Sequence, residues 1–90
     1  MSEFLDAQSK HNEHPDTFWV PSQKELDEIV ESQYVKICEN HERFWVKITE
    51  VDGEKLIGRV DNDLVNEHSF KCDDLVEFEK RNIMNILNED

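Results

Sequence analysis

Glycine, proline and cysteine are scarce in this chain, with two of each in 90 residues. Two glycines leave no room for a glycine-rich phosphate-binding loop, which excludes the common nucleotide-binding motifs. The two cysteines do not form a Cys-x-x-Cys pair, and the four histidines have no metal-ligand spacing with them, which excludes the usual structural zinc sites. These shortages remove most motif-based classes of enzyme and metalloprotein.

The sequence also lacks long apolar runs and an excess of cations. Residues 1–20 contain no apolar stretch of signal-peptide length, and no segment is long enough to span a bilayer. Lys and Arg number 10 against 22 Asp and Glu, so the net charge is −12. Nucleic acid and anionic membrane surfaces both require a cationic footprint. We therefore expect a cytoplasmic protein with two reduced thiols that binds neither of them directly.

Acidic residues are abundant, and they are spread evenly along the sequence. Residues 1–45 and residues 46–90 each carry a net charge of −6. The acid is therefore predicted to belong to a folded surface and not to a tail. Such a surface favours a basic protein partner, because long-range attraction speeds encounter. Solubility alone explains the charge at least as well.

Ninety residues suffice for one domain. Periodic segments place this domain at residues 14–87, after a flexible or short-helical segment at residues 1–13 and before a frayed end at residues 88–90. The clearest pattern spans residues 43–61, where two runs of alternating apolar residues meet at Asp52-Gly53. An Asp-Gly pair in that setting predicts a β-hairpin.

One helix is predicted over residues 22–30. Ser22 and Glu25 have the spacing of a capping box, and Leu26, Ile29 and Val30 follow as one apolar stripe.

Short β-patterned runs at residues 34–38 and 75–78 predict further strands. Residues 83–87 form a helical turn or a last strand, and residues 17–20, bounded by prolines, form an edge strand or a strand-like cover. The predicted fold class is α+β: a small, strongly bent antiparallel sheet of about five strands, an SH3-like partial barrel, with one packed helix.

Three different motifs follow one another along the chain: His14-Pro15-Asp16-Thr17-Phe18, Arg43-Phe44-Trp45-Val46 and Asp61-Asn62-Asp63. With neighbouring pieces they resemble a bacterial family of domains of unknown function often called YegJ-like, over most of the chain. The resemblance implies a compact β-rich domain, and it implies no activity, cofactor or catalytic residue. The chain departs from the family pattern at Ser32-Gln33 and Asp73-Asp74, where Gly-Asp is typical.

Catalytic and metal-binding residues are not evident. His11, His14, His41 and His68 are predicted to be exposed polar residues, since nothing in their spacing pairs them with a ligand set. Cys38 and Cys72 lie among carboxylates, which disfavour the reactive thiolate. No nucleophile, base and oxyanion donor can be assembled from the remaining motifs. We expect no enzymatic activity, no cofactor and no metal site.

The tryptophans carry the clearest binding signal. Trp19 and Trp45 both lie opposite the inward row of their predicted strands. Exposed tryptophans with an acidic rim are typical of binding hot spots, although a small domain also uses its large side chains to build a core. The predicted partner-binding residues are Trp19, Trp45, Asp61, Asp63, Glu67, Asp73 and Asp74.

These patterns lead us to expect a monomeric or homodimeric, non-enzymatic acidic protein that neutralises a basic, nucleic-acid-processing protein partner. Immunity proteins, antitoxins and phage inhibitors of defence nucleases are of this kind. The alternative is a housekeeping bacterial domain that binds a small ligand or peptide in a cleft beside Trp45. Reversal of several surface carboxylates to lysine abolishes the first activity and spares the second.

Overall fold

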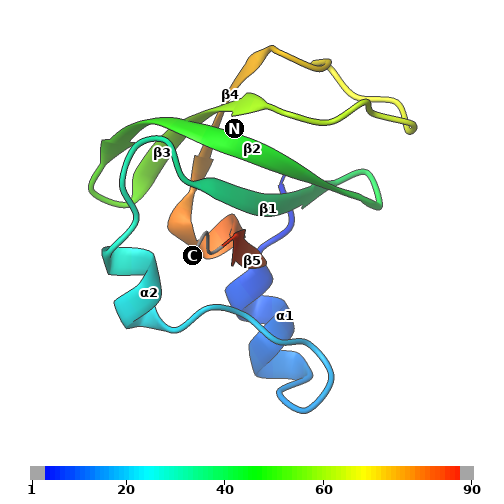
Figure 1. The fold of residues 1–90 in the computed structure, drawn as a ribbon. Coiled ribbons are helices and arrows are strands. Elements are labelled where there is room, and N and C mark those ends of the chain that lie inside the picture. The colour runs from blue at the N-terminus through cyan, green and yellow to red at the C-terminus, as the bar shows by residue number, and fades with distance from the viewer. Residues whose placement is uncertain (1–3, 88–90) are drawn as a thin grey trace.

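A five-stranded antiparallel sheet forms the body of the protein and curls strongly upon itself (Figure 1). The computed structural model describes residues 4–87, so the frayed end predicted at residues 88–90 lies outside the described residues, as do residues 1–3. The strand order is β4-β3-β2-β1-β5. The elements are α1 (Ala7–Glu13), α2 (Gln23–Asp27), β1 (Tyr34–Glu39), β2 (Glu42–Asp52), β3 (Lys55–Val60), β4 (Leu75–Glu79), the 3-10 helix η1 (Lys80–Asn82) and β5 (Asn85–Leu87).

The predicted α+β class, with an open and strongly curled sheet of five antiparallel strands, is confirmed, and its shape fits an SH3-like partial barrel. Two short helices lie outside the sheet, one of them within the predicted N-terminal segment (Figure 1). No helix within residues 4–87 combines the length and apolar character needed to cross a membrane.

The predicted hairpin at Asp52-Gly53 joins β2 to β3. Gly53 has a φ of 60°, a left-handed conformation that glycine adopts without steric cost. The pairing register of β2 with β3 shifts between Ile48 and Glu50. An irregularity of this kind bends a strand and increases its twist, so it contributes to the curl of the sheet.

Alternation along the strands places one face of the sheet in the core. Phe44, Val46 and Ile48 are 0–1% exposed, as the hairpin pattern predicted. Gly58 lies on the inward row of β3, where an added Cβ would lie 3.2 Å from both Phe78 Cε1 and the Lys47 carbonyl oxygen. The lack of a side chain at Gly58 therefore permits a close approach of the β2 backbone and the Phe78 ring.

The helix predicted over residues 22–30 begins as expected. The Glu25 N–H donates to Ser22 Oγ at 3.2 Å, and the Ser22 N–H donates to Glu25 Oε1 at 3.1 Å, which completes the capping box.

The same helix ends earlier than predicted, at Asp27. Leu26 and Ile29 are buried, but Val30 is 59% exposed, so the predicted stripe is wrong at Val30. The chain leaves the helix before Val30, whose N–H donates to Gln33 Oε1 at 2.8 Å. Side-chain capture of a backbone donor competes with continuation of a helix.

The segment before α2 does not join the sheet. Of the two interpretations of residues 17–20, the edge strand is wrong, since no strand forms there. Val20 packs in a small cluster with Ala7 of α1 and Met84. An ion pair of 2.7 Å between Asp6 and Arg81 also ties the start of α1 to η1.

Candidate functional site

Residues 61–74 connect β3 to β4 without helix or strand, and we call them the acidic loop. Connections of this length are uncommon in small domains and are typical of functional loops. In Figure 1 the acidic loop extends away from the sheet beyond the β1–β2 turn. The five predicted binding carboxylates all belong to it: Asp61, Asp63, Glu67, Asp73 and Asp74.

The two ends of the acidic loop meet beside Cys72. Burial raises the pKa of the Cys72 thiol, and the charges of Asp73, Asp63 and Asp61 raise it further. Three of the predicted carboxylates therefore lie near one another in space. Their field keeps this thiol protonated, which agrees with the expectation that Cys72 is a poor nucleophile.

The other two predicted carboxylates differ from this group. Asp74 is half-buried, and its Oδ2 accepts a hydrogen bond of 3.0 Å from the Lys71 N–H, so it holds a turn. Glu67 is exposed, and its backbone carbonyl accepts a hydrogen bond of 2.8 Å from Asn40 Nδ2. Its carboxylate remains available at the surface.

His68 fixes the middle of the acidic loop to the β1–β2 hairpin. The side chain of His68 is 0% exposed, with Nδ1 2.9 Å from Glu39 Oε1 and Nε2 2.8 Å from Glu42 Oε1. The imidazole stacks on the Phe70 ring at 5.1 Å and meets the Phe44 ring edge-on at 5.8 Å. We call His68, Glu39 and Glu42 the histidine latch.

The geometry of the histidine latch requires a charged imidazole. Both ring nitrogens face carboxylate oxygens, and both act as donors only in the imidazolium form. Burial by itself lowers the pKa of His68, but the hydrogen bonds to Glu42 and Glu39 outweigh burial and raise this pKa above its ordinary value.

Glu42 holds the loop by its backbone as well. Its two carboxylate oxygens accept hydrogen bonds of 2.8 Å from the N–H groups of Val65 and Asn66. The bond from His68, followed by these two backbone bonds, lowers the pKa of Glu42. Asn66 Nδ2 also donates to the Asn40 carbonyl at 2.9 Å. The acidic loop is therefore attached to the β1–β2 turn by both side chains and backbone.

The prediction that His68 is an exposed polar residue is wrong. Its partners precede it by 29 and 26 residues, so no local spacing points to them. The one sequence signal is the neighbouring Phe70, which marks a partly buried position inside an otherwise polar segment. Glu39 and Glu42 were missed for the same reason.

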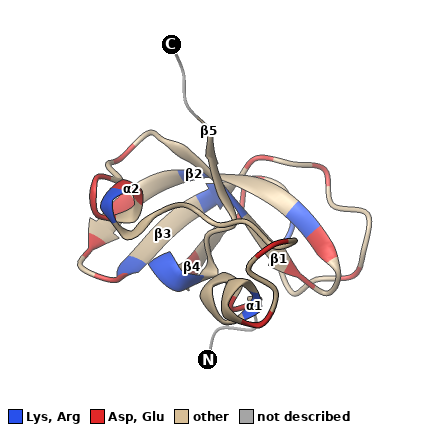
Figure 2. Ribbon diagram, turned by 90° about the horizontal axis from the view of Figure 1, so that it is seen from below, with Lys and Arg blue, Asp and Glu red and all other residues tan. Residues whose placement is uncertain are grey.

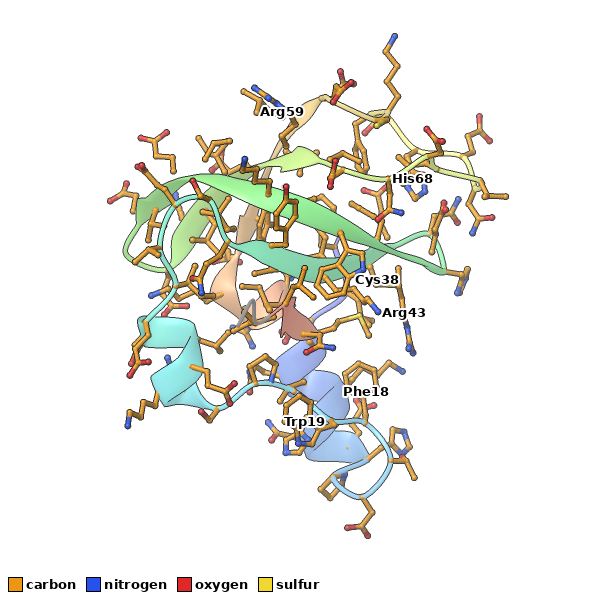
Figure 3. The ribbon with its side chains drawn as sticks, in the orientation of Figure 1. Phe18, Trp19, Cys38, Arg43, Arg59 and His68 are labelled. Atoms are coloured by element: carbon orange, nitrogen blue, oxygen red, sulfur yellow. The ribbon has the colours of Figure 1, made fainter. Side chains whose placement is uncertain are left out.

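The two tryptophans occupy different parts of the fold. Trp19 is 66% exposed and lies with Phe18 near α1, at the opposite end of the molecule from Arg59 (Figure 3). Trp45 is half-buried on the outer face of β2. Its backbone N–H donates to Asn62 Oδ1 at 2.6 Å, and its backbone carbonyl accepts from the Asp61 N–H at 2.9 Å. Trp45 therefore borders the acidic loop, and Trp19 does not.

A cation, and not only carboxylates, lies beside Trp45. Lys36 Nζ lies 4.8 Å from the centre of the Trp45 ring, and Lys47 Nζ lies 5.9 Å from the centre of the Tyr34 ring. Lys47 is also the register partner of Arg59 on β3. Figure 2 shows Lys and Arg along the strands, with much of the acid in the surrounding loops, turns and helices. The strands also carry carboxylates, so cations and carboxylates are mixed over the sheet.

Within residues 4–87, no group of three or more His, Cys, Asp or Glu side chains is arranged to hold a metal ion. Comparison of the chain with protein-family models, with curated proteins and with solved structures gave no match. The resemblance to the bacterial domains of unknown function stays a prediction, and the function has to be argued from the geometry described above.

Proposed function

We propose that the protein is a non-enzymatic binding protein that neutralises a basic, nucleic-acid-processing protein by docking it on the acidic loop. The observation that carries this proposal is that the histidine latch attaches the acidic loop to the β1–β2 hairpin while the outer side chains of the loop face solvent. Val65 in this loop is 88% exposed, and exposed carboxylates lie on both sides of it in the sequence. An apolar anchor inside a polar rim is the usual organisation of a protein-binding hot spot.

The histidine latch supports a docking role because burying its charged groups costs free energy that a simple connecting loop does not have to spend. Withdrawing His68 and two carboxylates from water is unfavourable unless each is well hydrogen-bonded. A loop that only joins β3 to β4 has no need of such a device. A loop that is ordered before its partner arrives loses less conformational entropy on binding, so the latch increases affinity.

The overall charge supports a basic partner. A net charge of −12 attracts cationic proteins over distances beyond direct contact. Proteins that process nucleic acid carry cationic surfaces for the phosphate backbone, and those surfaces are complementary to exposed carboxylates. An acidic loop seated there would exclude the nucleic acid and inhibit its processing.

The test compares two doubly substituted variants that lose the same charge. Asp63→Asn/Glu67→Gln alters the exposed carboxylates of the acidic loop, and Glu28→Gln/Glu31→Gln alters exposed carboxylates near α2. Each is immobilised, and proteins retained from a lysate of the source organism are quantified by mass spectrometry. We expect the unmodified protein and the α2 variant to retain the same basic protein and to inhibit its action on nucleic acid, with loss of both effects in the loop variant.

Retention should also weaken as NaCl is raised from about 0.05 M to about 0.5 M, because screening shortens the reach of the carboxylates. Equal retention by the two variants, or retention that is insensitive to salt, contradicts the proposal.

A further inference from the structure

β4 is an edge strand of the sheet, hydrogen-bonded to β3 on one side only. The Val60 N–H donates to the Asp74 carbonyl at 2.9 Å, and the Lys80 N–H donates to the Glu54 carbonyl at 3.0 Å. Bonded positions alternate along an antiparallel pair, so Val76 and Phe78 complete this ladder. The backbone groups of the alternate residues Leu75 and Glu77 point away from β3. Among the described residues, they have no backbone partner on that side.

A groove of about 740 Å³ runs along this free edge. β4 forms one wall, and Phe4, Ser69 and Phe70 contribute to the other. The Phe4 ring lies 5.8 Å from the Phe70 ring and 6.2 Å from the Phe78 ring, so aromatic groups converge at its base. Trp45, beside which sequence analysis placed a cleft, does not line this groove.

The charge along the groove is negative. Glu77 and Glu79 line it together with one cation, Lys55, and the third lining carboxylate, Glu39, is already paired with His68. The net charge of the whole chain has the same sign. An occupant with positive side chains is favoured by both. A second copy of this chain is disfavoured, because pairing of two β4 edges places glutamates of like charge in adjacent strands.

The alternation of β4 specifies the pattern of the occupant. Val76 and Phe78 point into the core, while Leu75 and Glu77 point outward. A strand added to this edge alternates in the same way. Its inward side chains meet the phenylalanine rings, and its outward side chains lie beside Glu77.

We propose that the free edge of β4 binds, by strand addition, an extended segment of a protein partner in which apolar residues alternate with Lys or Arg. Backbone hydrogen bonds to Leu75 and Glu77 supply affinity, and the groove selects the alternating side chains. The inference rests on the proposed function only for the basic character of the partner. The docking element is a different one, β4, and not the exposed carboxylates of the acidic loop.

The probe is the capped peptide acetyl-Val-Lys-Val-Lys-Val-Lys-amide, with the Val-Glu peptide of the same length as its matched control. Binding is measured by calorimetry, and amide hydrogen exchange is followed by NMR. We expect the Val-Lys peptide to slow exchange of the Leu75 and Glu77 amides by roughly tenfold or more at saturation. We expect the Val-Glu peptide to cause no such change.

Two changes remove the backbone bonds without removing the groove. Glu77→Pro deletes an outward N–H of β4, a change that an edge strand tolerates. N-methylation of alternate peptide residues deletes the matching donors and leaves the protein unaltered, so the test holds even if Glu77→Pro fails to fold. Either change should abolish protection of the Leu75 amide, and Glu77→Gln should weaken binding several-fold.

The inference is overturned if the Val-Lys peptide fails to bind, binds without protecting Leu75 and Glu77, or binds no better than the Val-Glu peptide. Unimpaired binding of the N-methylated peptide also overturns it. The loop variant Asp63→Asn/Glu67→Gln should bind the Val-Lys peptide as the unmodified protein does. Failure of the edge-strand inference is therefore distinguishable from failure of the proposed loop function.

Discussion

A single proton on His68 contributes to the order of the acidic loop. The pKa of His68 is raised above its ordinary value of 6.5, so its contribution to stability is complete below pH 6.5 and is lost as pH rises through the folded-state pKa. The pKa of Glu42 is lowered from its ordinary value of 4.5, so its contribution is present above pH 4.5 and is lost as pH falls through the folded-state pKa. The histidine latch is strongest between these two limits.

We therefore expect the free energy of unfolding to decrease as pH rises above about 6.5, and His68→Gln to flatten that dependence. Urea denaturation at a series of pH values measures both. His14→Gln serves as the control, because His14 is exposed and outside the histidine latch. An unchanged pH dependence in His68→Gln would show that the latch does not act through the imidazolium.

Gly58 is a position in the curled sheet that has no room for a larger side chain. An added methyl group approaches backbone at Lys47 and a packed ring at Phe78, so Gly58→Ala should lower the free energy of unfolding by about 1–3 kcal/mol. Gly53→Ala is the control: it meets no atom within 4 Å and should cost only about 1 kcal/mol, through its positive φ. Equal losses at the two positions, measured by urea denaturation, would contradict the tight packing at Gly58.

At the scale of elements, the acidic loop depends on β2 for its order. Glu42→Gln removes the charge that attracts His68 and weakens the acceptors of the Val65 and Asn66 amides. We expect faster hydrogen exchange at these two amides, with the strand amides of Val46 and Ile48 unchanged. Glu50→Gln, an exposed position on the same strand, should leave Val65 and Asn66 protected. Loop amides that exchange alike in all three proteins would show that Glu42 does not order the loop.

The elements also show what a sequence can predict here. Strands and the β2–β3 hairpin follow from alternation and an Asp-Gly pair, and the start of α2 follows from the capping box of Ser22 and Glu25, so local chemistry suffices. The early end of α2 depends on Gln33, and the histidine latch joins residues separated by more than 25 positions. The position of Lys36 over Trp45 depends on the register between β1 and β2. Such contacts are set by the assembled fold, and local spacing does not encode them.

At the scale of the whole molecule, charge is abundant and poorly compensated. Among the described residues, the Lys and Arg ion pairs join Lys80 to Asp27 and Arg81 to Asp6, which leaves most carboxylates without a cationic partner. Self-repulsion of a chain with a net charge of −12 opposes the compact state.

Added salt should therefore stabilise this protein. We expect the Tm to rise as NaCl is increased from about 0.01 M to about 0.2 M, because screening weakens the repulsion between carboxylates. Glu28→Gln/Glu31→Gln, with two fewer charges, should show a smaller rise in the same scanning calorimetry experiment. A Tm that falls with salt would mean that attractive pairs, and not repulsion, dominate the electrostatics.

The surroundings of the two native thiols have a further consequence. Burial raises the pKa of Cys38, as burial and three nearby carboxylates raise that of Cys72, so alkylating reagents should react slowly with both at neutral pH. A cysteine introduced at the open position of Val65 should then take up a maleimide dye first. The native chain thus offers a low-background scaffold for placing a single fluorophore on the loop.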